Sequence, residues 1–225
     1  MAADDDKRLA AEAAVAEVRD GMLVGLGTGT TAAYAVKALA RRVAAGLKVE
    51  TVATSEATAA AARAAGLVVR DFADIAALDL AIDGADEIDP RLYAIKGAGG
   101  AMLREKTVAA ASRRMVVIAD GSKRVAAIGA ARLPVEVLPF ARASVVAALA
   151  RLGAAVTVRD GYVTDNGNLI ADCRFPAMPD PRALAAEIAA IPGALGHGLF
   201  LDEVDAAYIA ADGVVTRLER GGPSD

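Results

Sequence analysis

The chain has 225 residues, enough for one large domain or a domain with a smaller companion, and this length can bury a core without disulfide or metal staples. Its net charge is −4 at pH 7, with no long basic run, four Phe, four Tyr and no Trp, which excludes the charge pattern and aromatic platforms of nucleic-acid binders. Its single cysteine and single histidine exclude an internal disulfide and any metal site built from several Cys or His side chains.

The N-terminal sequence MAADDDKRLAAE is acidic where a secretory signal would be basic and then apolar. Charged residues or prolines interrupt the apolar stretches before they reach membrane-spanning length. We therefore expect a cytoplasmic protein with neither a membrane nor a nucleic acid as its partner.

Helical and strand patterns alternate over the first half of the chain. A helix is expected at 5–19, a strand at 22–26, a helix ending near residue 43, strands at 49–53, 68–69, 78–83 and 92–96, a helix beginning near residue 100, and a strand at 115–120. Such alternation is typical of an α/β protein with βαβ units. We expect a Rossmann-like, mainly parallel sheet with helices on both faces, formed by residues 1–131 and 206–225.

The rhythm changes near residue 133. Residues 132–205 follow the order β-α-β-β-α-β, with Asn166-Gly167 as a hairpin signal, and this order predicts an inserted ferredoxin-like α+β domain. A closing hairpin is expected to turn at Asp212-Gly213. We expect the inserted domain to serve assembly and support rather than chemistry.

A loop rich in glycine and threonine, GLGTGTT (25–31), follows the first strand and opens a helix. Glycine N–H groups, threonine hydroxyls and a helix N-terminus suit an anion, although a plain tight turn would read the same way. A dinucleotide fingerprint requires glycine at position 30, where Thr30 stands, and no Walker motif exists. The loop therefore favours a terminal monophosphate, held by Thr28, Gly29, Thr30 and Thr31.

An acidic motif, DGADEID (83–89), follows the apolar strand LDLAI. Carboxylates at the carboxyl end of a strand suit a metal, a polyol or a catalytic acid, whereas a solvated Asp-Gly turn is the alternative. The spacing alone leaves a Mg²⁺ site with two carboxylates open.

The third motif is KGAGGAMLREK (96–106), in which Lys96 precedes a glycine loop and Glu105 lies in the next helix. Taken alone these are surface charges, but all three motifs, and Lys123 after the strand 115–120, follow strands of the expected sheet and share one edge. There Glu105 is expected to act as a general base, and Lys96 with the N–H groups of Gly97–Gly99 to stabilise an oxyanion. This chemistry is proton abstraction beside the carbonyl of a sugar phosphate, without a redox cofactor.

Seven ordered motifs together resemble the type A ribose-5-phosphate isomerase family: GLGTGTTAA, TSEAT, DGADEID, KGAGGAMLREK, LPVEVLPFAR, VTDNGN and IPGALGHGLF. The resemblance extends from about residue 7 to residue 219. It implies interconversion of ribose 5-phosphate and ribulose 5-phosphate through a cis-enediolate in the non-oxidative pentose phosphate pathway. It also implies a homodimer or homotetramer that uses no metal or other cofactor.

By this resemblance, Glu105 shuttles a proton between C1 and C2, Asp83 and Lys96 assist ring opening and carbonyl polarisation, and Asp86 lies near the sugar hydroxyls. Phosphate is assigned to the threonine loop with Lys7 and Lys123. The expected substrate-binding residues are Lys7, Thr28, Gly29, Thr30, Thr31, Asp83, Gly84, Ala85, Asp86, Lys96, Gly97, Ala98, Gly99 and Lys123.

The chain departs from the family at Ala98, because many relatives read KGGGA where this chain reads KGAGG. A positive φ at this position would be costly for alanine. His197 and Cys173 lie in the inserted domain, and we interpret both as structural. A sugar-phosphate sensor without catalysis is the main alternative function, but a sensor would not need Glu105 beside Lys96. An NAD-linked oxidoreductase is a further alternative, but Thr30 stands where the dinucleotide fingerprint requires glycine.

Overall fold

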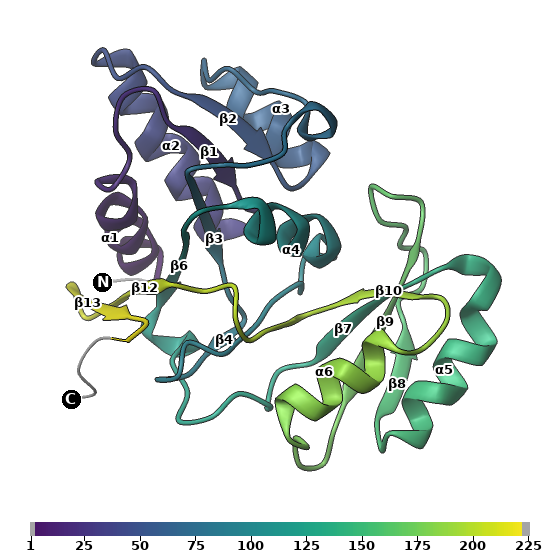
Figure 1. Ribbon diagram of the computed structural model, residues 1–225. Coiled ribbons are helices and arrows are strands. Elements are labelled where there is room, and N and C mark those ends of the chain that lie inside the picture. Colours follow the sequence, from purple (N-terminus) through teal and green to yellow (C-terminus); the bar gives the residue numbers. More distant parts are fainter. Residues whose placement is uncertain (1–2, 222–225) are drawn as a thin grey trace.

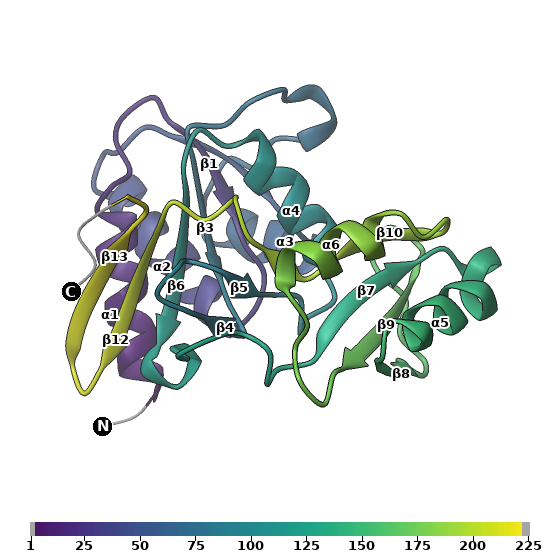
Figure 2. The ribbon, with the colours of Figure 1, turned by 60° about the horizontal axis from the view of Figure 1, so that its bottom comes forward.

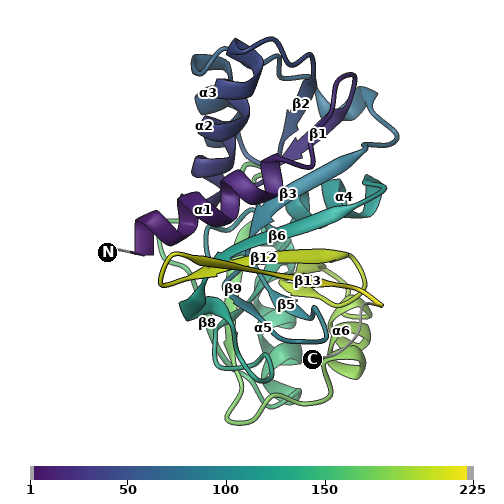
Figure 3. The same cartoon turned by 90° about the vertical axis from the view of Figure 1, so that its left-hand side faces the viewer.

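The structure is a computed structural model that describes residues 3–221. Its central sheet consists of five parallel strands and one antiparallel strand (Figure 1). The strands run from one edge to the other in the order seen in Figure 3: β2 (Glu50–Ala53), β1 (Leu23–Leu26), β3 (Leu80–Gly84), β6 (Met115–Asp120), β12 (Ala206–Ala211) and β13 (Val214–Glu219). Only β13 is antiparallel, and it pairs with β12 through the hairpin predicted at Asp212-Gly213.

Helices cover both faces of this sheet, as the sequence predicted. The helices α1 (Ala3–Val15), α2 (Thr30–Ala44) and α3 (Glu56–Ala64) belong to one face, and α4 (Met102–Ala111) to the other. Successive residues of β6 alternate between the two cores: Ile118 packs with the first set of helices, whereas Val117 packs on the α4 side. This period of two explains why the strand is apolar throughout, since both of its faces are buried.

The strand order places a topological switch point between β1 and β3. In open α/β sheets the connections leave in opposite directions at such a point, and the resulting crevice at the carboxyl ends of the strands binds ligands. The threonine loop follows β1 and the acidic motif follows β3. The fold therefore brings two of the three predicted motifs to the place where a ligand is expected.

The second unit is a four-stranded antiparallel sheet with the strand order β10-β7-β9-β8 (Figure 1). Along the chain its elements are β7 (Leu133–Val137), the 3₁₀ turn η3 (Pro139–Ala141), α5 (Arg142–Arg151), β8 (Ala155–Val158), β9 (Leu169–Arg174), α6 (Pro181–Ala189) and β10 (Ala194–His197). This arrangement confirms the ferredoxin-like fold. Cys173 is fully buried in its core, in agreement with a structural role.

A third, three-stranded sheet lies between the two units (Figure 2) and corrects one expectation. It consists of β4 (Glu87–Ile88), β5 (Ala94–Ile95) and β11 (Leu199–Phe200), with β5 in the middle. The predicted strand 92–96 belongs here and not to the main sheet. Residues 199–200 pair with β5, so a strand of this sheet lies inside the segment 132–205 that is expected to form the inserted domain. The division of the chain into domains remains a prediction.

Two smaller expectations were also wrong. Residues 68–69 form no strand; Val69 makes a single bridge to Thr51, and the 3₁₀ turn η1 (Phe72–Asp74) follows. Asn166-Gly167 does not join two strands in a tight hairpin, because the long loop 159–168 connects β8 and β9. The extra residues of this loop reach the first unit, as described below.

Candidate active site

A buried lysine between two buried carboxylates forms the centre of the site. Lys96 Nζ lies 2.8 Å from Asp83 Oδ2 and 3.1 Å from Glu105 Oε2, and these three side chains are only 2–4% exposed. Lys96 also donates to the carbonyl of Gly84 at 2.5 Å. Asp83 ends β3, Lys96 follows β5 of the small sheet, and Glu105 lies on α4, so three separate elements bring these charges together.

Burial changes the protonation of these groups. Loss of solvent and the neighbouring Asp83 raise the pKa of Glu105 to about 8, against the opposing effect of Lys96. Burial likewise raises the pKa of Asp83, although Lys96 opposes it. Burial disfavours the Lys96 ammonium, but the two carboxylates outweigh this effect and its pKa is raised. The site therefore holds a fixed cation beside a carboxylate whose pKa is near neutrality.

One carboxylate oxygen of Glu105 is buried beside Lys96. This atom, Oε2, lies at ion-pair distance from Lys96, but it accepts no hydrogen bond from any of residues 3–221. A buried acceptor that is left unpaired is unfavourable, so such an atom in a native site indicates a ligand or a catalytic role.

Gly27 allows Asp83 to take its position. A Cβ atom on residue 27 would lie 1.8 Å from Asp83 Oδ1, so no other residue fits there without displacing the carboxylate. The carboxylate is then fixed by the N–H groups of Thr28 (3.1 Å) and Gly84 (2.7 Å). The second glycine of the threonine loop is thus explained by the approach of Asp83.

The start of α2 provides an anion site. Gly29 precedes this helix with φ 112° and makes no side-chain cap, so the first N–H groups of the helix, from Thr30 and Thr31, have no capping side chain. Thr31 lies close to Gly84, since a Cβ on that glycine would be 3.7 Å from Thr31 Cβ. Thr31, in the first turn of α2, therefore lies next to the end of the strand that carries Asp83.

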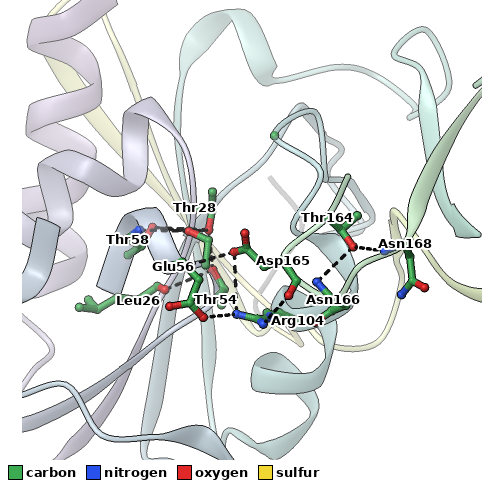
Figure 4. Close-up of polar contacts among 12 residues, drawn as sticks. Leu26, Thr28, Thr54, Glu56, Thr58, Arg104, Thr164, Asp165, Asn166 and Asn168 are labelled. Atoms are coloured by element: carbon green, nitrogen blue, oxygen red, sulfur yellow. Dashed lines mark hydrogen bonds and ion pairs between the residues drawn. The ribbon is translucent and has the colours of Figure 1, made fainter. Parts of the chain in front are cut away.

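The Thr28 hydroxyl belongs to a cluster of hydroxyl groups. Its Oγ1 lies 2.8 Å from Thr54 Oγ1 and 2.9 Å from Ser55 Oγ, and Thr58 donates to the Gly27 carbonyl (Figure 4). These three residues belong to TSEAT, at the end of β2 and the start of α3, and sequence reasoning assigned them no role. Their position after a strand of the same sheet was the signal that could have identified them.

The glycine loop accepts Ala98 without strain. Positive φ angles occur at Gly97 (99°) and Gly100 (81°), whereas Ala98 is not among the residues with positive φ. The Ala98 N–H donates to Asp86 Oδ2 at 2.9 Å, so it is not free for an oxyanion. The N–H groups of Gly97 and Gly99 have no hydrogen-bond partner within residues 3–221 and remain available.

The acidic motif divides between site and scaffold. Asp83 and Asp86 face the site, and Ala85 packs in the core on the α4 side. Glu87 instead accepts from the N–H groups of Gly129 and Ala131, and Asp89 pairs with Arg91 at 2.6 Å. No group of three or more His, Cys, Asp or Glu side chains placed to hold a metal ion occurs within the described range.

Two lysines complete the predicted set. Lys123, in the turn η2 (Gly121–Lys123) after β6, lines a cavity of about 540 Å³ together with Asp86 and Ala98. Lys7 lies on α1, whose Asp6 accepts from the N–H of Gly213 at the carboxyl end of β12. Both lysines therefore lie at the expected edge, but the only ion pair given for Lys7 is with Asp4, at 3.6 Å.

His197 lies apart from these charges, on β10. Its Nδ1 accepts from the N–H of Leu199 at 3.3 Å, and burial lowers its pKa to about 4. This agrees with the structural interpretation.

The fold and the site together define an enzyme that moves a proton on a small, phosphorylated substrate. A carboxylate with a pKa near neutrality suits a general base, a buried ammonium ion suits a developing oxyanion, and a helix N-terminus suits a phosphate. Comparison with known proteins identifies the family.

A family model described as Ribose 5-phosphate isomerase A (phosphoriboisomerase A) matches residues 50–213. Proteins named Ribose-5-phosphate isomerase A from Sphingopyxis alaskensis and Methylorubrum extorquens are 54% and 50% identical to this chain, over 96% and 94% of both sequences. The chain belongs to the ribose 5-phosphate isomerase A family.

Solved structures show the same fold. A D-ribose-5-phosphate isomerase in complex with phospho-erythronic acid has a TM-score of 0.94 at 33% identity, covering 98% of this chain and 100% of the other. Ribose 5-phosphate isomerase A from Neisseria gonorrhoeae has a TM-score of 0.93 at 35% identity, covering 97% and 98%. Within the described residues, no helix is both long and apolar enough to span a bilayer.

Proposed function

We propose that this protein interconverts D-ribose 5-phosphate and D-ribulose 5-phosphate through an enediolate, in the non-oxidative pentose phosphate pathway. The observation that carries this function is the placement of Lys96 between Asp83 and Glu105 in a buried site. The related isomerase that binds phospho-erythronic acid, a phosphorylated sugar acid, supports a ligand of this kind. Because phosphorylated sugars are charged and do not leave the cell freely, the cytoplasm is the proposed location.

The substrate is proposed to bind with its phosphate at Thr28–Thr31, near Lys7 and Lys123, and its hydroxyls near Asp86. Asp83 and Lys96 assist ring opening. Glu105 then removes the proton from C2 of the open aldose, and the electrons of that C–H bond form the C1–C2 double bond of the enediolate. Lys96 and the Gly99 N–H stabilise the charge on oxygen.

The proton of the O2 hydroxyl passes to O1, and Glu105 returns its own proton to C1, so that the electrons of the O2–H bond form the ketone carbonyl at C2 and O1 becomes a hydroxyl. The carbon skeleton is neither oxidised nor reduced overall, so the reaction balances without a redox cofactor. The sensor alternative is not favoured, because a protein that only binds sugar phosphate has no use for a buried base beside a buried ammonium ion.

Formation of ketopentose from ribose 5-phosphate tests this function directly. We expect conversion that continues after EDTA treatment, because the proposed mechanism uses protein groups alone. Wild-type protein that binds ribose 5-phosphate without converting it would instead support the sensor.

The pH dependence should report the ionisation of Glu105. A base must be deprotonated to accept a proton, and the pKa of this carboxyl is about 8. We therefore expect kcat/KM to fall as the pH decreases below about 8, with a slope of one in a logarithmic plot. The substrate phosphate titrates near pH 6, so an acidic limb centred there would contradict the assignment to Glu105.

We also propose that the protein is a homodimer or homotetramer that associates through the second unit. Phe140 is 97% exposed, and Leu138 and Leu195 nearby are each 40% exposed. Leu138 donates to the Gly193 carbonyl, which brings it next to the strand that carries Leu195. An apolar group of this kind is unfavourable in water and suits burial against another copy.

Phe140→Asp is expected to shift the protein toward monomer in sedimentation velocity, because a charge would have to be buried in the interface. Val214→Asp is the matched control, since Val214 is 68% exposed on β13 in the other unit. An oligomer that persists in Phe140→Asp would contradict this surface.

A further inference from the structure

The second unit holds the glycine loop by its carbonyl oxygens. Arg159 donates to the carbonyls of Ala98 (Nη1, 2.9 Å) and Gly97 (Nη2, 3.3 Å), and the Tyr162 hydroxyl donates to the carbonyl of Gly99 at 2.9 Å. Three consecutive peptide groups of the loop are thus bound by side chains that lie more than 60 residues away in the sequence. Both donors belong to loop 159–168.

Arg159 is itself fixed in place. Its Nε and Nη2 each donate to a different oxygen of Asp172 at 2.8 Å, which is a bidentate pair, and Asp172 is buried on β9. The Arg159 backbone N–H bonds to Ile170, and its guanidinium lies 5.6 Å from the centre of the Tyr162 ring. A planar guanidinium held on two edges has little freedom, so it can serve as a rigid support.

Fixing the carbonyls also fixes the N–H groups. A trans peptide is planar, with its C=O and N–H pointing in opposite directions. The Gly97 carbonyl faces Arg159, and the following N–H, from Ala98, accordingly points to Asp86. The Ala98 carbonyl also faces Arg159, so the Gly99 N–H points away from the second unit. Gly99 itself lies against Thr28 of the threonine loop.

The other end of loop 159–168 is bound to the first unit. Arg104, one residue before Glu105, donates to Asn166 Oδ1 at 2.8 Å and to the Asp165 carbonyl at 3.0 Å, and it pairs with Glu56 on α3 (Figure 4). The Glu56 N–H donates to the Asp165 carboxylate at 2.8 Å. The loop is therefore anchored on both sides of the glycine loop.

We propose that Arg159, fixed by Asp172, is a positioning residue for isomerisation that aims the Gly99 N–H at the developing enediolate oxygen. The inference rests on the proposed function and changes the role of the second unit, since a residue of that unit then determines the geometry at the reacting atoms. Arg159 lines the same cavity as Lys123 and Asp86, and its side-chain hydrogen bonds in the described chain go to the loop and to Asp172. Its loss should affect the transition state more than substrate binding.

The test is steady-state kinetics of Arg159→Ala, Arg159→Lys and the control Arg151→Ala, with thermal unfolding of each. Arg159→Ala is expected to lower kcat by about 10- to 100-fold, the loss typical of a small misplacement of catalytic groups, with KM within about threefold. Arg159→Lys keeps the charge and places its donors on a single nitrogen, so it should recover part of the kcat. Arg151 is an exposed arginine in the last turn of α5 of the same unit and lies outside this cavity, so Arg151→Ala should keep its rate.

Wild-type kcat in folded Arg159→Ala, an equal loss in Arg151→Ala, or a change confined to KM would overturn the inference. If Arg159→Ala does not fold, the kcat of Arg159→Lys tests the inference instead. One ammonium group cannot make both bonds to Asp172 and also reach the two carbonyls of the loop. An unchanged kcat in that variant overturns the inference. A wild type that does not convert ribose 5-phosphate would instead overturn the proposed function, and the inference with it.

Discussion

Glu105→Gln is expected to lower kcat by about 10²–10⁴-fold, the usual contribution of a general base, while KM changes little. The amide keeps the size and polarity of the side chain but cannot accept the C2 proton. Steady-state kinetics and exchange of the C2 hydrogen with solvent measure this effect, and both should be lost together. Glu187→Gln, on the exposed side of α6, is the matched control and should keep full activity.

Stability separates loss of the base from loss of the fold. The pKa of Glu105 is about 8 in the folded protein and near 4.5 in the unfolded chain, so the folded state binds more protons between these values. The wild type should therefore lose stability as the pH rises from about 5 to 8, and Glu105→Gln should lose less. Full activity in the variant would mean that another group is the base, with Asp83 the next candidate.

Lys96→Met is expected to reduce both activity and stability. Removal of a cation that stabilises an oxyanion lowers kcat by about 10²–10³-fold, and removal of one partner from a buried ion pair destabilises a protein by about 3–5 kcal/mol. Here the cost falls on Asp83 and Glu105, which would face each other without the ammonium between them. Denaturant unfolding at pH 8 and the isomerase assay measure the two effects.

The double variant Lys96→Met with Asp83→Asn distinguishes the two roles of the lysine. Replacing one carboxylate by an amide removes the charge repulsion, so stability should partly return while activity stays low. If activity returned together with stability, the lysine would only support the fold. Lys37→Met, in which the changed residue is exposed on α2, is the control for loss of a single positive charge.

The sequence predicted most of the fold because its elements are locally encoded. The alternation of apolar strands and helical patterns identified the parallel sheet, and the order of elements after residue 133 identified the ferredoxin-like unit. The candidate residues Asp83, Lys96 and Glu105 come together as expected, although Lys96 reaches the edge of the main sheet from the small sheet and Glu105 from α4. Sequence reasoning could therefore identify the participants.

The partners of those residues could not be predicted in the same way. Arg159 and Ala98 are 61 residues apart, and no local pattern marks an arginine that will bind a distant carbonyl. The strand that precedes Lys96 is a second example. It was predicted in the main sheet, and this was wrong because a strand of two residues carries no information about which strands lie beside it. Long-range side-chain contacts depend on the packed structure, whereas periodicity reports only on which face is buried.

The small sheet that carries Lys96 has a consequence for how the protein is made. The middle strand β5 needs β11, which lies about a hundred positions later, and a ribosome adds about 5–20 residues per second. The nascent chain therefore contains all three charged residues for several seconds before the strand that flanks the lysine exists. Closure of so long a loop makes this contact a late event in folding. The catalytic centre is thus completed only after the inserted unit has been synthesised, even though every charged group in it was supplied by the first half of the chain.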